Sequence, residues 1–373
     1  MRVSFFATLA AAVVNPSKES RMRGALLGAL VADSLSLSTH YEYDAKKIKS
    51  YYGHIDRYYA PGEKTGGQTH GVGWGARNFH NGNGNGPAKK AGEQTDYGDY
   101  NLLIAEHLAN TASKPHMMDL KELVPFWQGQ MRTWRSWMCT QTRQALQKVS
   151  QGTPVDRLGG PSNAMAVRHA AAHAYYDKED EVAKVARLSM FTHAETTALQ
   201  GGEFFARVTH RVIHDGVTPK EAIEAVAAQS SSFVQSKVKL ALDKAKEAMD
   251  SSSSLSKEEY VDDLAITSMG RLWDVGKSEP IKVGKASPTE GTLPGSVYFI
   301  VKYAGNFAGA AMANAEVGGD CASRAVAIGM VMGAAEGVEG IPAQFGKGKL
   351  VEWEAAQGYL DKMPLIKKAK NEL

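Results

Sequence analysis

Two segments of the chain carry small residues at every fourth position, and this spacing constrains the fold more than any other feature. Gly24, Gly28 and Ala32 fall on one face of a helix expected over residues 21–37. A second segment repeats the pattern with Ala325, Gly329, Gly333 and Gly337. Side chains this small let another helix approach closely, because no bulky atoms separate the two backbones. The pattern therefore favours an all-α protein with tightly packed, buried helices.

Helical patterning covers most of the remaining chain. It resumes at Tyr100 and continues over residues 119–150, 163–176, 179–192, 195–214, 219–229, 232–249, 257–274, 296–315 and 323–337. Residues 45–94, rich in Gly, Tyr, His and Asn, and residues 276–295 are typical of long loops. The sequence shows neither convincing strand alternation nor a repeat of fixed period. We predict an all-α, single-domain orthogonal helical bundle of about a dozen helices over residues 21–373.

Composition and charge argue against several classes of function. The 43 Lys and Arg residues nearly balance the 40 Asp and Glu residues, and the net charge of +3 gives no reason to expect a nucleic-acid partner. No apolar run reaches the roughly 18 to 20 residues that a membrane-spanning helix needs. Cys139 and Cys321 are too few for a disulfide framework or a four-thiolate zinc site, so cytosolic thiols are the simpler interpretation. None of these features specifies an oligomeric state.

The first twenty residues differ in character from the rest. Arg2 precedes the apolar run VSFFATLAAAVV, which has the short basic start and small-residue end of a secretory signal. A disordered leader, or an apolar segment packed on the first helix, also agrees with this composition. We therefore treat residues 1–20 as a leader or a signal or transit segment, and we favour a cytoplasmic location.

Polar chemistry in a helical protein gathers at helix ends and connecting loops, and three short segments meet this criterion. They are QTDYGDY at 94–100, GGPSN at 159–163 and GGDCAS at 318–323. Carboxylates and hydroxyls this close on a turn can bring hard oxygen ligands to a magnesium-like cation. Paired glycines let backbone amides turn toward an anion. The simpler alternative is structural, because Asp99 and Ser323 are also good helix N-caps.

The order of these segments resembles the ADP-ribosylglycohydrolase family. The helix RMRGALLGALVADSLSL is similar to the opening signature of that family and puts Asp33 at the position of its acidic residue. Further matches follow in the family's order, namely Thr95-Asp96, Gly-Gly-x-x-Asn at 159–163, LSMFTH at 188–193, Gly318-Gly319-Asp320 and Gly340-Ile341-Pro342. The resemblance spans residues 21–345. The Gly-Gly-Asp segment with its small-residue helix is the most specific part.

This resemblance implies an all-helical fold with two magnesium ions in a cleft and metal-assisted hydrolysis of an ADP-ribosyl glycosidic bond. The candidate metal ligands are Thr95, Asp96, Asp99, Asp320 and Ser323. The candidate residues for binding ADP-ribose or an ADP-ribosylated substrate are Gly159, Gly160, Asn163, His193, Gly318 and Gly319. No residue is assigned to the catalytic step itself.

The chain departs from the family pattern at two expected magnesium ligands. Where the family has Thr-Asp-Asp, Tyr97 replaces the second Asp. Where the family has Gly-Gly-Asp-x-Asp-Thr, Ala322 replaces the second Asp and Ser323 replaces the Thr. Each lost carboxylate removes a negative charge and an oxygen ligand from a dication. Asp99, one helical turn beyond Asp96, is a candidate replacement that would leave one magnesium ion or an altered pair.

A branch of the family carries a similar Tyr-Gly-Asp turn, and the jellyfish J-type lens crystallins, which have a structural role, resemble that branch. The THYEYD segment at 39–44 is also closer to this branch. Three functions stay open: a hydrolase with a reduced metal site, a catalytically silent protein that binds ADP-ribose, and a crystallin-like scaffold. Glu42 lies near a further acidic position of the hydrolases, but a solvated loop residue is the simpler interpretation.

Other chemistry-bearing residues have simpler structural interpretations. His169 and His173, spaced as on one face of a helix, favour packing over zinc binding, because zinc needs a third ligand. Trp127, Trp134 and Trp137 are most simply a buried helix face, and stacking on an adenine is the alternative.

Overall fold

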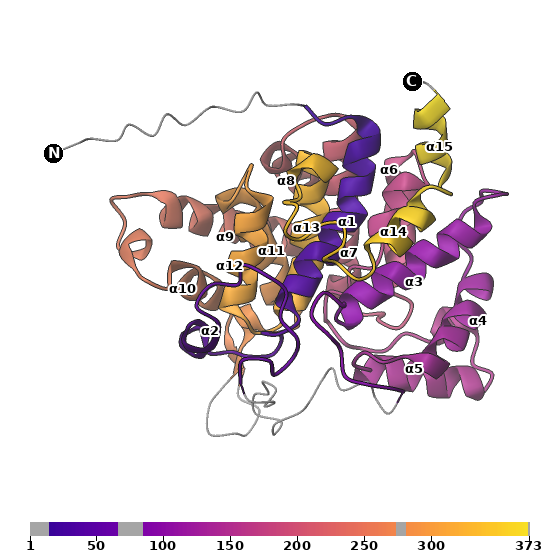
Figure 1. The fold of residues 1–373 in the computed structure, drawn as a ribbon, viewed down its shortest axis with the longest axis horizontal. Helices are drawn as coiled ribbons and strands as arrows, with labels where there is room; N and C mark the ends of the chain where they lie inside the picture. The colour runs from indigo at the N-terminus through magenta and orange to yellow at the C-terminus, as the bar shows by residue number, and fades with distance from the viewer. Residues whose placement is uncertain (1–14, 66–84, 274–280, 372–373) are drawn as a thin grey trace.

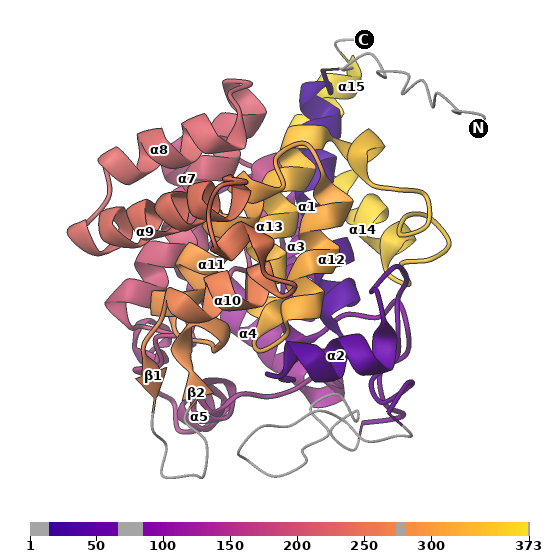
Figure 2. The same cartoon turned by 90° about the vertical axis from the view of Figure 1, so that its left-hand side faces the viewer.

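The computed structural model describes residues 15–65, 85–273 and 281–371, so most of the expected leader lies outside the described residues. The described chain is built of α-helices joined by loops and short 3-10 turns (Figures 1 and 2). The helices are α1 (Lys18–Ser36), α2 (Ala45–Tyr52), α3 (Asp96–Thr111), α4 (Leu120–Gln130), α5 (Thr140–Ser150), α6 (Glu179–Ser189), α7 (Thr196–His214), α8 (Pro219–Ala228), α9 (Ser232–Met249), α10 (Val261–Ser268), α11 (Thr289–Lys302), α12 (Phe307–Val317), α13 (Cys321–Glu336), α14 (Trp353–Leu360) and α15 (Pro364–Asn371). Among the described residues, no helix is long and apolar enough to span a membrane.

Helices α1 and α13 form the centre of the molecule and lie side by side (Figure 2). Their small-residue stripes meet: Gly24 faces Gly333, and Gly28 faces Gly329, so the two helices run antiparallel. A Cβ atom built on any of these four glycines would overlap the facing backbone. The close helix approach predicted from the sequence is therefore confirmed.

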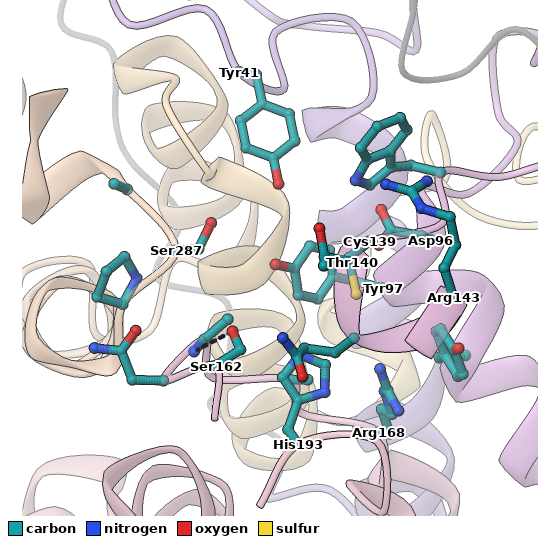
Figure 3. Close-up of a pocket in the computed structure, with 18 of the residues that line it drawn as sticks. Tyr41, Asp96, Tyr97, Cys139, Thr140, Arg143, Ser162, Arg168, His193 and Ser287 are labelled. Carbon is teal, nitrogen blue, oxygen red and sulfur yellow. Dashed lines mark hydrogen bonds between the residues drawn. The ribbon is translucent and has the colours of Figure 1, made fainter. Parts of the chain in front are cut away.

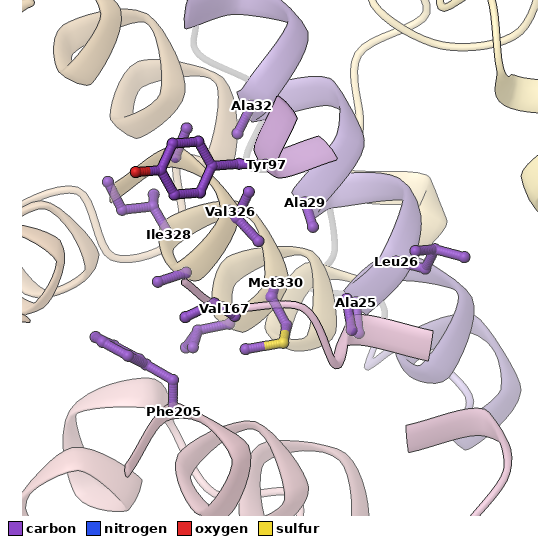
Figure 4. Packing of buried hydrophobic residues seen from close by; sticks show 14 of the residues in the cluster. Ala25, Leu26, Ala29, Ala32, Tyr97, Val167, Phe205, Val326, Ile328 and Met330 are labelled. Carbon is purple, nitrogen blue, oxygen red and sulfur yellow. The ribbon is translucent and has the colours of Figure 1, made fainter. Parts of the chain in front are cut away.

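The other helices pack around this central pair. Helix α11 contacts α9 and α13, and α7 contacts α6, α8 and α13. Across the pair, α3 contacts α1 and α14 (Figure 1). Apolar side chains of α1 and α13 form the core together with Val167 and Phe205 (Figure 4). The predicted all-α bundle is confirmed, with one small addition, a pair of two-residue antiparallel strands, β1 (Leu272–Trp273) and β2 (Ile281–Lys282).

Helix caps define the N-terminal ends of α3 and α13. Thr95 Oγ1 accepts a hydrogen bond from the Tyr97 N–H at 3.1 Å and caps α3. Asp320 Oδ1 accepts one from the Ser323 N–H at 3.2 Å and caps α13. The cap assignments of Asp99 and Ser323 are wrong, because both residues lie inside the first turn.

Residues 163–176 do not form the predicted helix. They contain only a 3-10 turn over Ala170–Ala174. The segment before this turn bonds to neighbouring segments instead of to itself, since Ala164 forms an antiparallel bridge with Pro288. This pairing competes with the local i to i−4 bonds that a helix needs.

Residues 119–150 divide into α4 and α5 instead of forming one continuous helical region. Trp134 and Trp137 lie in the segment between the two helices, whereas Trp127 lies within α4. The prediction of a single tryptophan face is therefore wrong. Trp134 is buried, and Trp137 lines a cavity.

Candidate functional site

A cavity of about 340 Å³ opens where the N-terminal end of α3 meets α5 and several loops (Figure 3). Its walls combine aromatic rings, two guanidinium groups, one carboxylate and small polar side chains. The lining residues include Tyr41, Tyr43, Asp96, Tyr97, Tyr100, Trp137, Cys139, Gln141, Arg143, Ser162, Asn163, Arg168, His193 and Ser287. The volume falls within the range of about 300–1,000 Å³ that small-molecule pockets occupy.

Asp33 on α1 holds the turn that leads into the cavity. Its fully buried carboxylate accepts hydrogen bonds from the Thr95 N–H at 2.7 Å and from Thr95 Oγ1 at 2.6 Å. Burial raises the pKa of Asp33 to about 7, although the two bonds from Thr95 oppose this rise. Asp33 thereby fixes Thr95, and the next residue, Asp96, reaches the cavity wall.

Asp96 provides the carboxylate of the cavity. Its Oδ1 atom is buried and has no hydrogen-bond partner among the described residues. Burial and then the negative charges of Asp320 and Asp33 raise the pKa of Asp96 well above its usual value. A buried acceptor left without a donor costs about 1–3 kcal/mol. A ligand that supplies a donor here would therefore gain binding free energy.

Asp320 is fully buried and has both carboxylate oxygens engaged. Tyr97 Oη donates a hydrogen bond to Oδ2 at 3.0 Å, and His40 Nε2 lies 3.1 Å from Oδ1. Burial alone would raise the pKa of Asp320, but hydrogen bonds with His40, Ser287 and Tyr97 lower it to about 2. Burial and the charge of Asp320 raise the pKa of Tyr97 well above its usual value, so the tyrosine keeps the proton that it donates.

The Gly318-Gly319 turn joins the loop after α1 to the start of α13. Both glycines have positive φ values, 71° and 67°. The Gly319 N–H donates to Glu42 O at 2.6 Å, and Gly319 O accepts from the Tyr41 N–H at 2.7 Å. Tyr41 has a φ of 67° and is the one non-glycine residue in the described chain with a positive φ. The turn therefore binds the loop that brings Tyr41 to the cavity.

Glu42 lies beside this turn and is buried, in contrast to the solvated residue predicted. Its Oε1 atom accepts a hydrogen bond from the Asp44 N–H at 2.9 Å. Glu42 is not among the residues that line the cavity.

Gly160 and His193 lie in two segments that pair with each other. The Gly160 N–H donates to Thr192 O at 3.1 Å, and Gly160 and His193 form a parallel bridge. His193 reaches the cavity with its Nδ1 atom 2.9 Å from Thr192 Oγ1. Burial and then the charge of Arg168 lower the pKa of His193 to about 3. The ring is therefore neutral at physiological pH.

Sequence reasoning missed the two arginines of the cavity. Arg168 is buried, and its guanidinium carbon lies 3.6 Å from the centroid of the Tyr100 ring. Arg143 on α5 is exposed, with its guanidinium carbon 5.1 Å from the Trp137 ring centroid. Arg168 could have been found from its position, because it follows the matched segment 159–163 by five residues. No pattern in the sequence singled out Arg143.

Comparison with known proteins shows which family this chain belongs to. The sequence model of the ADP-ribosylglycohydrolase family matches residues 14–371. The chain belongs to the ADP-ribosylglycohydrolase family. A solved structure described as an ADP-ribosylglycohydrolase-related protein complex is similar over 94% of this chain and 99% of that chain, with a TM-score of 0.56. At 19% sequence identity this likeness concerns the fold. No curated protein sequence matches.

The structure brings together only some of the metal ligands expected from the ADP-ribosylglycohydrolase pattern. Asp96 lines the cavity, and Asp320 lies close enough for its charge to raise the Asp96 pKa. Asp99 does not line the cavity, and its Oδ2 atom accepts a hydrogen bond from Lys89 Nζ at 2.5 Å. Ser323 Oγ donates to the backbone oxygen of Asp320 at 2.9 Å.

This set of donors does not fit the magnesium pair that the ADP-ribosylglycohydrolase family implies. Both Asp320 oxygens accept hydrogen bonds, and the Thr95 hydroxyl donates to a carboxylate. Ala322 has no oxygen in its side chain, and Tyr97 presents a protonated hydroxyl. Across the described ranges, no three His, Cys, Asp or Glu side chains are placed to hold a metal ion. Magnesium keeps several waters among its roughly six oxygen ligands but is still held through one or two carboxylates. Asp96 Oδ1 is a buried carboxylate oxygen with no hydrogen-bond partner among the described residues.

The substrate-binding residues expected from the family pattern divide into two groups. Asn163 and His193 line the cavity, whereas the glycines do not, namely Gly159, Gly160, Gly318 and Gly319. Asn163 O accepts hydrogen bonds from Thr289 N–H and Thr289 Oγ1, both at 2.8 Å. These two bonds hold the loop that contains Asn163 against the N-terminal end of α11.

Proposed function

We propose that this ADP-ribosylglycohydrolase family member binds an ADP-ribosyl group in the cavity beside Asp96. The observation that carries the proposal is the unpartnered Asp96 Oδ1 atom, buried in a cavity that two arginines also line. Hydroxyl groups of a ribose are donors of the kind that this oxygen lacks within the part of the chain that the structure describes. Arg143 and Arg168 supply positive charge on the same cavity wall.

The chemistry of the cavity suits each part of an ADP-ribosyl group. Guanidinium groups bind phosphate oxygens through paired, charge-assisted hydrogen bonds, so Arg143 and Arg168 suit the diphosphate. Aromatic rings stack on bases, and Trp137 and Tyr41 offer such rings at the cavity wall. The neutral His193 ring and Asn163 add polar groups without adding charge. The ligand class is therefore an adenine nucleotide with a diphosphate-linked ribose.

Binding has more support than two-magnesium hydrolysis. Tyr97 and Ala322 supply no carboxylate where the family pattern has one, and Asp320 is already saturated with hydrogen bonds. The proposed role of the chain is therefore recognition of the ADP-ribosyl group, with Asp96 orienting the ribose hydroxyls.

A crystallin-like scaffold is the second candidate function. The hydrogen bonds of Asp320 and Gly319 to other protein groups favour this scaffold role, because these bonds stabilise the fold and do not contact a ligand. We also propose a cytoplasmic location, which agrees with two free thiols, Cys139 and Cys321.

Calorimetric titration of ADP-ribose into the full chain in EDTA tests the proposed function. We expect saturable binding, and we expect Arg143→Gln to weaken it by about tenfold through loss of a charged hydrogen bond. Arg132→Gln is the matched control, because Arg132 is an exposed arginine that does not line the cavity. Its affinity should equal that of the unmodified protein.

The other outcomes separate the competing functions. Absence of binding heat from folded protein would overturn the proposal and favour the scaffold. Release of free ADP-ribose from an ADP-ribosylated protein, only when magnesium is added, would show that the chain is a metal-dependent hydrolase instead.

A further inference from the structure

The Asp320 carboxylate is held by groups from four parts of the fold, one of them Ser287 in the loop before α11. Tyr97 at the start of α3 donates to Oδ2 at 3.0 Å, and His40 from the loop after α1 lies 3.1 Å from Oδ1. The Ser323 N–H of α13 donates to Oδ1 at 3.2 Å. The side chains of His40 and Asp320 have no exposed surface. Bulk water therefore takes no part in this arrangement.

A carboxylate buried this deeply needs compensation for its lost hydration. In a metal site the cation supplies it. Here the hydroxyl of Tyr97, the ring of His40 and the N-terminal end of α13 supply it. Tyr97 stands where the family pattern has its second Asp, so a hydrogen-bond donor occupies the position of a metal ligand.

The His40 ring is itself held in place. The Tyr41 ring stacks on it with the centroids 4.0 Å apart and an angle of 22° between the planes. The Tyr41 N–H bonds to the carbonyl of Gly319, the residue directly before Asp320. The stacked rings and this backbone bond link His40 to the turn that carries Asp320, so protein groups hold the geometry around the carboxylate.

We propose that Tyr97, Asp320 and His40 form a network that replaces the metal ions and joins the starts of α3 and α13 without a divalent cation. Tyr97 is a positioning residue in this network, because its hydroxyl holds Asp320 while its ring forms part of the cavity wall. The folded state is therefore independent of magnesium. The proposal holds whichever ligand the cavity binds, because its test uses the ligand-free protein.

Thermal unfolding of the full chain in EDTA and in magnesium chloride tests this network. The unmodified protein should have the same Tm in both solutions. Tyr97→Asp places a third carboxylate beside Asp96 and Asp320, so mutual repulsion should lower its Tm in EDTA. Magnesium should restore part of that loss, because an ion that binds only the folded state stabilises it.

Three results would overturn the proposal. One is a rise in Tm of the unmodified protein on adding magnesium chloride, and another is calorimetric binding of magnesium to it. The third is a folded Tyr97→Asp variant whose Tm ignores magnesium, since Tyr97 would then not occupy a metal-ligand position.

Tyr97→Phe keeps the test decisive when Tyr97→Asp fails to fold. Tyr58→Phe is its matched control, because Tyr58 is similarly buried and its hydroxyl donates to the neutral oxygen of Phe345 at 2.7 Å. Hydrogen bonds to an ionised acceptor are the stronger kind. Tyr97→Phe should therefore lower the Tm further than Tyr58→Phe does. Equal losses would show that the Tyr97 hydroxyl does not support Asp320.

Discussion

Gly24 on α1 and Gly333 on α13 face each other so closely that a Cβ atom on either would overlap the carbonyl oxygen of the other. The same relationship repeats one turn away between Gly28 and Gly329. A side chain larger than hydrogen at either pair would force the two helices apart. This pair therefore sets the distance between Asp33, which holds the start of α3, and the N-terminal end of α13.

Adding one methyl group at this contact should destabilise the protein. We expect Gly333→Ala to lower the free energy of unfolding by about 1–3 kcal/mol, because the helices must move apart. Gly358→Ala is the matched control, since Gly358 is an exposed helical glycine with nothing within 4 Å of a built Cβ. Alanine there should stabilise by about 0.5–1 kcal/mol. Urea unfolding measures both changes, and a neutral Gly333→Ala would contradict the close helix contact.

Four histidines pack together between the 3-10 turn at Ala170–Ala174 and α7. The ring centroids of His169 and His173 lie 6.0 Å apart, and those of His210 and His214 lie 4.0 Å apart. All ring nitrogens of His169 and His173 are buried, and none has a hydrogen-bond partner in the described ranges. Burial lowers the pKa of His169 to about 3, and burial with the charges of neighbouring histidines lowers that of His173. His169 and His173 are therefore buried packing residues, as predicted.

This cluster should make stability depend on pH. In the unfolded chain a histidine titrates near a pKa of about 6.5, so the unfolded state binds more protons as the pH falls below that value. The free energy of unfolding therefore has its full value above this pH and decreases as the pH falls below it. His169 and His173 should each contribute a loss of about 1 kcal/mol one pH unit below it.

Urea midpoints measured across this pH range check the sign and the source of the effect. His173→Leu should reduce the pH dependence of the free energy of unfolding, because it removes one of the buried rings. An identical pH dependence in His173→Leu and the unmodified protein would exclude His173 as a source.

Tyr41→Gly and Tyr41→Ala compared with each other should separate ligand binding from backbone strain, because both variants lose the ring that stacks on His40. The φ of 67° at this position suits glycine, so loss of the ring brings no new backbone strain. We expect the affinity for ADP-ribose to fall by about tenfold through lost stacking. Tyr41→Ala loses the same ring but keeps an unfavourable φ, so it should show the same affinity and a lower Tm than Tyr41→Gly. Unchanged affinity in both variants would place the ligand away from Tyr41.

The two cysteines should differ in reactivity toward dithionitrobenzoate. Cys139 is half-buried and lines the cavity, whereas Cys321 is fully buried and burial raises its pKa to about 11. Since the thiolate is the reactive form, one thiol should react in the native protein and both in urea. Cys139→Ser should abolish the native reaction, and ADP-ribose should slow it. Rapid reaction of Cys321 in the native protein would contradict its burial.

The first turn of α3 shows how far spacing along the chain can predict a site. Thr95 and Asp96 stand out in the sequence, and the structure places Asp96 at the cavity wall. Helical spacing also suggested Asp99, but that carboxylate pairs with Lys89, which the loop before α3 supplies. Spacing along one helix shows which residues share a face. It does not show which partner a separate segment brings to that face.

The sequence by itself determined the all-α fold, the close central helix pair and the family. These follow from residues a few positions apart, because helical periodicity and small-residue stripes are local properties. Only the tertiary structure decided that the Tyr97 hydroxyl meets Asp320, 223 positions away, and that Arg143 and Arg168 share a cavity. Such contacts depend on how whole helices and loops pack, and packing is the sum of many interactions that no short pattern contains.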